Sequence, residues 1–149
     1  YFIQSLADAE GVPYYQVLSH SQCLSADVNA AFDPIYGEVH ERRNASYINY
    51  GVVVTKYTGA RGKAGTNDAT AEMMGFARRI LDAEHVGWQT GELGKVDQGG
   101  GGTVAMYVSQ HNIDTVDLGV PVLSMHAPFE VVAKADVYMT YRAMRAFYK

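Results

Sequence analysis

The sequence has little cysteine, no long hydrophobic run and no cluster of positive charge. Its one cysteine, Cys23, cannot form an internal disulfide, which excludes the disulfide-stapled secreted class and leads us to expect a cytoplasmic location. No apolar stretch reaches transmembrane length and no signal-peptide pattern is present, so we expect no membrane partner. Lysines and arginines are scattered apart from the pairs at 42–43 and 78–79, so we expect no nucleic-acid partner.

The overall composition is that of an ordinary globular protein. The chain has 149 residues, 48% of them hydrophobic, and a net charge of −4. This length corresponds to about one domain. Because the chain begins at Tyr1 rather than at a methionine, we expect a fragment or a processed product.

Helical and strand-like segments alternate along the chain. Apolar spacing predicts helices over residues 2–10, 13–21, 68–84, 103–110 and 129–149, the third of them capped by Asn67 or Asp68. Short β-branched or apolar runs predict strands over residues 23–28, 47–57, 86–90 and 120–123. This alternation predicts an α/β fold with a mixed, largely parallel sheet flanked by helices.

His126 follows the predicted strand over residues 120–123 and precedes Pro128, which ends that strand. In open α/β sheets, ligands bind beyond the carboxyl ends of the strands, because the loops there are free to carry polar groups. His126 is therefore a candidate metal ligand. A histidine at a strand end can equally cap the strand or bond within the core, and the spacing alone leaves both interpretations open.

Asp27 interrupts the apolar run over residues 23–28. A carboxylate there is costly to bury unless a cation or hydrogen bonds compensate its charge. Asp27 is thus either a carboxylate compensated by a cation or by hydrogen bonds, or a residue that turns the chain into Asn29. His40, in the polar run that follows, fits a solvated surface or an oligomer contact.

Four consecutive glycines end the segment over residues 91–102. Ordering such a segment costs much chain entropy, so we expect its backbone to approach a ligand or another element closely, with Gly101 and Gly102 contacting a peptide. A nucleotide-phosphate loop is disfavoured, because Gly94-Lys95 is followed by Val96 rather than by Ser or Thr.

Several segments resemble, in the same order along the chain, the aspartyl aminopeptidase and aminopeptidase I family of zinc exopeptidases. These segments are 24–34 (LSADVNAAFDP), 51–56 (GVVVTK), 91–103 (GELGKVDQGGGGT), 124–130 (SMHAPFE) and 134–141 (KADVYMTY). Members of the family are roughly three times longer than this chain, well above the usual single-domain length. The resemblance implies that residues 1–149 are the C-terminal part of one metallopeptidase catalytic domain whose N-terminal part is absent.

The resemblance also implies a zinc-dependent aminopeptidase that uses two zinc ions per complete protomer. It makes Asp27 and His126 metal ligands and Lys56 a substrate contact, although an ordinary exposed lysine at a strand end also fits Lys56. The chain has no match to the family's general base, so no catalytic residue is expected here and the isolated chain should be inactive. Large homo-oligomers are common in the family.

One alternative is a non-catalytic module of the same fold that binds a peptide or assembles with a partner. Another is a different dizinc aminopeptidase family with a similar sheet.

Overall fold

The computed structural model describes residues 1–61, 64–95 and 97–149. Positions 62–63, between the predicted strand over residues 47–57 and the predicted helix over residues 68–84, and position 96 of the glycine-rich segment lie outside the described residues. The central sheet has the strand order β1–β7–β3–β5, namely β1 (Gln22–Ser25), β7 (Asp114–Gly119), β3 (Val52–Thr55) and β5 (Trp88–Thr90). The pairs β1–β7 and β3–β5 are parallel, whereas β7 and β3 are antiparallel. The predicted α/β class with a largely parallel sheet is confirmed.

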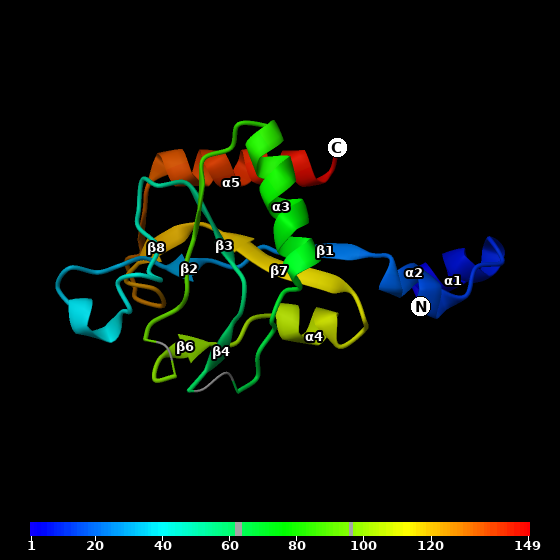
Figure 1. The fold of residues 1–149 in the computed structure, drawn as a ribbon, viewed down its shortest axis with the longest axis horizontal. Coiled ribbons are helices and arrows are strands. Elements are labelled where there is room, and N and C mark those ends of the chain that lie inside the picture. The colour runs from blue at the N-terminus through cyan, green and yellow to red at the C-terminus, as the bar shows by residue number, and fades with distance from the viewer. Residues whose placement is uncertain (62–63, 96) are drawn as a thin grey trace.

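The two faces of this sheet differ in character because successive strand residues point to opposite sides. On one face, Val52, Val54, Val116 and Leu118 form the core with Met73, Ala77 and Leu81 of α3 (Ala71–Ala83) and Ala143 of α5 (Lys134–Phe147). The opposite face carries Thr55, Thr115 and Asp117 and packs against α4 (Ala105–Ser109). Figure 1 shows α3 and α5 above the sheet and α4 below it.

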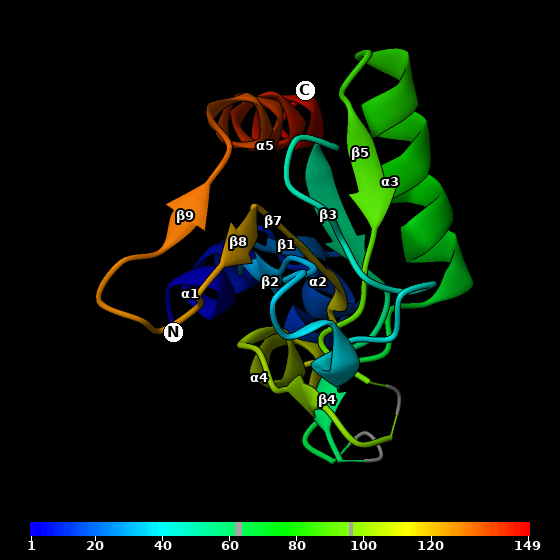
Figure 2. The ribbon, with the colours of Figure 1, turned by 90° about the vertical axis from the view of Figure 1, so that its left-hand side faces the viewer.

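Two smaller sheets extend from the central one. The first has the order β2–β8–β9, with β2 (Asn29–Ala30) parallel to β8 (Pro121–Leu123) and β8 antiparallel to β9 (Val131–Val132). The second is a ribbon of β4 (Gly59–Ala60) and β6 (Gly100–Gly101). Figure 2 shows β8 and β9 on the side of the molecule away from α3.

Several predicted elements need correction. The strand predicted over residues 23–28 ends at Ser25, and β7 was not predicted as a strand. The last helix begins at Lys134 rather than at residue 129, because Val131 and Val132 pair with Leu123 and Val122 as a hairpin. The strand predicted over residues 47–57 shortens to β3. The cap of α3 is Thr70, whose hydroxyl accepts a hydrogen bond from the Met73 amide at 3.1 Å, and not Asn67 or Asp68.

The first two helices, α1 (Phe2–Ala9) and α2 (Tyr14–Ser19), follow the prediction closely and lie together at one end of the molecule (Figure 1). A short 3-10 turn, η1 (Gly37–Val39), lies between β2 and β3. Within the described part of the chain, none of the helices combines the length and the apolar character needed to cross a bilayer.

Asp136 joins α5 to the turn that begins β3. Its side chain is 1% exposed, and its two carboxylate oxygens accept hydrogen bonds from the amides of Asn49 (2.7 Å) and Gly51 (2.8 Å). A buried carboxylate is tolerated when such bonds satisfy it. The turn is therefore fixed by a residue more than eighty positions away in the sequence.

We predict that Asp136→Asn lowers the free energy of unfolding by about 2 kcal/mol, because the amide group must place an NH₂ against one of two N–H donors. Thermal and denaturant unfolding of the chain would measure the change. The matched control is Asp8→Asn, which removes an exposed carboxylate on α1 and should change the stability by less than about 0.5 kcal/mol. Equal effects of the two substitutions would contradict this role of Asp136.

Candidate metal and peptide-binding site

Asp27 lies in a gap between two paired stretches of parallel strand. Ser25 is opposite Asp117, and Asn29 is opposite Pro121, so the register is the same on both sides of the gap. The Asp27 carboxylate is half-buried, and its Oδ1 accepts a hydrogen bond from the Val28 amide at 2.9 Å. A carboxylate held this way by its own backbone has a fixed direction, as a metal ligand requires.

Gly119 lies directly against the main chain of Asp27. A Cβ atom at Gly119 would stand 1.6 Å from the Asp27 carbonyl oxygen and 2.5 Å from its carbonyl carbon. No side chain fits there, because real Cβ atoms do not approach other atoms within 3.0 Å. The absence of a side chain at Gly119 therefore allows its main chain to lie in direct contact with the main chain of Asp27.

A buried carboxyl group, Asp117, lies next to this segment. It is 3% exposed, and its Oδ2 accepts a hydrogen bond from the Thr103 hydroxyl at 3.0 Å. Burial raises the pKa of Asp117, hydrogen bonds from Ser25 and Thr103 lower it, and the charge of Asp27 raises it further. Asp117 thus connects Ser25, at the end of β1, with Thr103, which directly follows the four glycines.

His126 lies in the exposed turn between β8 and β9. Both Ser124 (φ 58°) and His126 (φ 68°) adopt the left-handed conformation, which costs energy for a residue other than glycine. The turn is closed by the Ala127 amide, which donates to the Ser124 carbonyl at 3.0 Å, and by the His126 amide, which donates to Glu130 Oε1 at 2.6 Å. The predicted position of His126 beyond a strand end is confirmed.

A cavity of about 410 Å³ lies beside the His126 turn. Three segments meet in it: Ala30 and Ala31 after Asp27, Leu93, Gly94 and Gly99 of the glycine-rich segment, and Ser124 and Met125 before His126. Its size and mainly apolar lining suit one side chain of a bound peptide. Asp27 itself lines a different groove of about 370 Å³, with Cys23, Ser25, Val104 and Val108.

His40, which the sequence predicts to be a solvated residue or an oligomer contact, lines the larger cavity. It is half-buried, its ring lies 5.4 Å from that of Phe32, and its Nε2 accepts a hydrogen bond from the Asp33 amide at 3.4 Å. Burial lowers the pKa of His40, whereas the nearby Asp33 and Glu38 raise it. Nothing in the sequence indicated that His40 lines a cavity, because the residues that follow it are charged.

Lys56 lies apart from these groups. Its ammonium pairs with the Asp68 carboxylate, and it lines a groove of about 400 Å³ between α3 and the β3–β5 edge with Trp88 and Thr90. In this chain Lys56 is a partly exposed, paired lysine. The contact with a substrate therefore remains a prediction.

The glycines form one strand of the β4–β6 ribbon. At Gly100, φ is 104° and a Cβ would lie 2.0 Å from the Gly59 carbonyl oxygen, so this glycine is required by the backbone. A Cβ at Gly101 would meet only the end of the Leu93 side chain at 3.0 Å, and one at Gly102 would lie 3.2 Å from the Gly65 oxygen. The expected close backbone approach is thus found within the chain.

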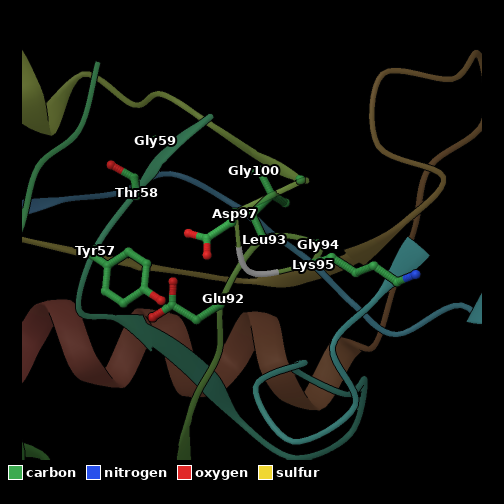
Figure 3. A pocket seen from close by; sticks show the side chains of 10 residues that line it. Tyr57, Thr58, Gly59, Glu92, Leu93, Gly94, Lys95, Asp97 and Gly100 are labelled. Carbon is green, nitrogen blue, oxygen red and sulfur yellow. The ribbon is translucent and has the colours of Figure 1, made fainter. Parts of the chain in front are cut away.

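A second cavity lies beneath this ribbon, with a volume of about 20 Å³. Figure 3 shows the Tyr57 ring and the Glu92 carboxylate pointing toward one another at its side, near Asp97. This volume holds about one water molecule and is too small for a peptide side chain. The peptide-binding candidate is therefore the larger cavity beside the His126 turn.

Asp27 and His126 have donor types that suit zinc, which binds carboxylate oxygens and imidazole nitrogens. In the described part of the chain, however, no group of three or more His, Cys, Asp or Glu side chains lies together as a metal site would require. A catalytic zinc needs about three protein ligands. The donor types fit zinc, but their number in this chain does not complete a site.

The contact between Gly119 and Asp27 gives a test. We predict that Gly119→Ala destabilises the chain by about 2 to 3 kcal/mol, because the main chain of Asp27 or of β7 must move. Gly75→Ala in α3 is the matched control, since a Cβ there meets only the Arg79 side chain at 3.5 Å and alanine favours a helix. Denaturant unfolding of both variants measures the difference, and a neutral Gly119→Ala would show that this close contact is absent.

The chain is similar to known proteins of one family. The family model described as "Aminopeptidase I zinc metalloprotease (M18)" matches residues 3–148. A probable M18 family aminopeptidase 1 of Clostridium acetobutylicum is 50% identical over 140 residues, which is 94% of this chain and 30% of that protein. One from Thermotoga maritima is 46% identical over 144 residues, covering 97% of this chain and 32% of that protein. The chain thus spans about a third of the length of these relatives.

Solved structures give the same result. Aminopeptidase I from C. acetobutylicum superimposes with a TM-score of 0.89 at 48% identity, over 96% of this chain and 31% of that one. The T. maritima M18 aminopeptidase gives 0.90 at 42% identity, over 98% of this chain and 34% of that one. The mApe1 dodecamer of Saccharomyces cerevisiae shares the fold, with a TM-score of 0.75 at 20% identity over 98% of this chain and 32% of that one. The chain belongs to the M18 family of aminopeptidase I zinc metalloproteases.

Proposed function

We propose that this chain is the C-terminal part of the catalytic domain of a zinc-dependent aminopeptidase, which removes N-terminal residues from peptides with a water activated by two zinc ions. The observation that carries the proposal is the cavity beside the His126 turn, where three sequence-distant segments of the family signature meet. The family and the fold support the general activity. The two-zinc mechanism and the roles of single residues are our inference.

In this proposal Asp27 and His126 hold the metal. Zinc, when bound, polarises the substrate carbonyl and lowers the pKa of a water toward neutrality. The Asp27 carboxylate is oriented by the Val28 amide, and the His126 imidazole is presented to solvent by a turn in which His126 and Ser124 adopt the left-handed conformation. The remaining ligands and the general base come from outside these 149 residues, since the chain spans only about a third of its relatives. The isolated chain is inactive for the same reason.

The substrate contacts we assign are Lys56, Gly101 and Gly102. Gly101 carries no side chain where the glycine strand faces Leu93, which itself lines the cavity, so a peptide backbone can run alongside. Lys56 has a partly exposed ammonium that can exchange Asp68 for a substrate carbonyl at small cost, because exposed ion pairs are weak.

We also propose that the enzyme forms a large homo-oligomer and acts in the cytoplasm. The dodecamer formed by the yeast structural neighbour supports the proposal of a large homo-oligomer. The half-buried, unpaired thiol of Cys23 supports a location in the cytoplasm.

The function is tested in the full-length protein with His126→Ala. We predict at least a hundredfold loss of peptide hydrolysis and reduced zinc content, with the fold retained, because the substitution removes only an exposed imidazole. The measurements are metal analysis, release of the N-terminal residue from a test tripeptide and circular dichroism. His111→Ala, another exposed histidine, is the control and should leave all three unchanged.

A folded His126→Ala protein with full activity and unchanged zinc content would remove His126 from the ligand set. A wild-type protein without zinc and without hydrolysis would instead favour the non-catalytic module, which binds a peptide or a partner through the same fold.

The substrate contact at the glycines is tested with a matched pair of substitutions. Gly101→Val should lower kcat/KM about tenfold at nearly unchanged melting temperature, since its Cβ meets only the movable end of Leu93. Gly100→Val should lower the melting temperature, because its backbone is left-handed and crowded by Gly59. Normal activity of Gly101→Val, with a large loss of thermal stability, would mean that the glycines serve only the ribbon.

A further inference from the structure

The segment that carries Asp27 is attached to β3 by one buried side chain, Asn29. Asn29 is 5% exposed. Its main-chain N–H donates a hydrogen bond to the Val120 carbonyl at 3.0 Å, and this bond begins the β2–β8 pairing. Because Ala26 to Val28 lie outside the paired strands, Asn29 is the first residue after Asp27 that is fixed in a sheet.

Both ends of the Asn29 side-chain amide are used. Its Nδ2 donates to the Thr55 hydroxyl at 3.0 Å, and its Oδ1 accepts from the Ser46 hydroxyl at 2.8 Å. Thr55 is 4% exposed and Ser46 is fully buried, so water cannot replace either partner without opening the fold. An amide is the side chain that can donate to one hydroxyl and accept from another in this geometry.

These bonds join segments of the proposed site that are otherwise separate. Thr55 directly precedes Lys56 at the end of β3, and Asn29 directly precedes Ala30 of the cavity beside the His126 turn. Ser46 in turn holds the chain beyond β2, because its carbonyl accepts from the Phe32 amide at 2.7 Å and it bridges Ala31. The backbone segments on either side of Asn29 are therefore fixed relative to β3.

We propose that Asn29 is a positioning residue that holds the Asp27 carboxylate in place for the metal by tying its segment to Thr55 and Ser46. It lies two positions from Asp27 and acts through the backbone. The proposal rests on the function proposed above, in which Asp27 is a ligand.

Residues that orient ligands typically change metal affinity or activity by about 10- to 100-fold when they are removed. Loss of the Asn29 side-chain amide removes the hydrogen bonds to Thr55 and Ser46, while the backbone pairing with β8 and the Asp27 carboxylate remain. We therefore expect a weaker zinc site rather than no site. Asn29→Ala removes no side chain that lines the peptide-binding cavity, so kcat should fall by a larger factor than KM rises.

The test uses the full-length enzyme with Asn29→Ala and, as a second variant, Thr55→Val, which replaces the accepting hydroxyl by a methyl group of similar size. Zinc affinity is measured by competition with a chelator, and kcat and KM by release of the N-terminal residue from a test tripeptide. Each variant should weaken zinc binding and lower kcat about tenfold. Thr55→Ser, which keeps the hydroxyl, should restore both.

The matched control is Asn67→Ala. Asn67 is 4% exposed and lies just before α3, and its Nδ2 donates a buried hydrogen bond to the Thr115 main-chain carbonyl at 3.0 Å. Its removal should lower the melting temperature about as much as Asn29→Ala does. Zinc affinity and kcat should stay within about threefold of the wild type.

Asn29→Ala or Thr55→Val proteins that fold and bind zinc as tightly as the Asn67→Ala control would overturn the proposal and make Asn29 an ordinary structural residue. The same holds if Thr55→Ser is as defective as Thr55→Val. A wild-type enzyme that binds no zinc would refute the proposed function as well, and this outcome is visible before any variant is made.

Discussion

The structure depends on the parallel pairing of residues 22–30 with residues 114–122, which keeps one register across the unpaired positions at its middle. This pairing places Asp27 over Gly119, forms β2 and β8 in line with β1 and β7, and leads the second strand into the His126 turn. The close contact at Gly119 is possible only without a side chain. The two proposed ligands thus lie along one pair of neighbouring chain segments, Asp27 between β1 and β2 and His126 in the turn after β8, although ninety-nine positions separate them in the sequence.

The two faces of the central sheet differ in the side chains that they bury. The valine- and leucine-rich face binds α3 and α5 and supplies most of the buried apolar surface. The other face carries buried polar groups, namely Ser25, Thr55, Thr115 and Asp117. Of these, Thr55 binds the Asn29 side chain and Asp117 binds the Thr103 hydroxyl. Hydrogen bonds have direction where apolar contacts do not, so the polar face fixes loop geometry more closely than a second apolar face would.

Much of the fold was predictable from local pattern, and the errors have physical causes. The α3 periodicity identified its helix because Met73, Ala77 and Leu81 share one side. Val131 and Val132 were misassigned because an apolar pair beside a helix fits helical spacing until a partner strand, here β8, is known. The roles of Asn29, Asp117 and Asp136 depend on partners that local pattern does not reveal. For the site, the position of His126 beyond a strand was predictable, whereas the cavity lined by His40 was not, since three separate segments form it.

The unbroken register has a consequence for how this part of the chain can vary in length. Side chains alternate with a period of two, so inserting or deleting one residue among Ala26 to Val28 would exchange the directions of Asn29 and Ala30. The amide would then leave its two hydroxyl partners, and a methyl group would take its place in a polar pocket. Substitution at Ala26 or Val28 is compatible with the structure, but the number of residues between β1 and β2 is not free to change. Loops elsewhere on the surface, such as the exposed turn at Gly11, carry no such restriction.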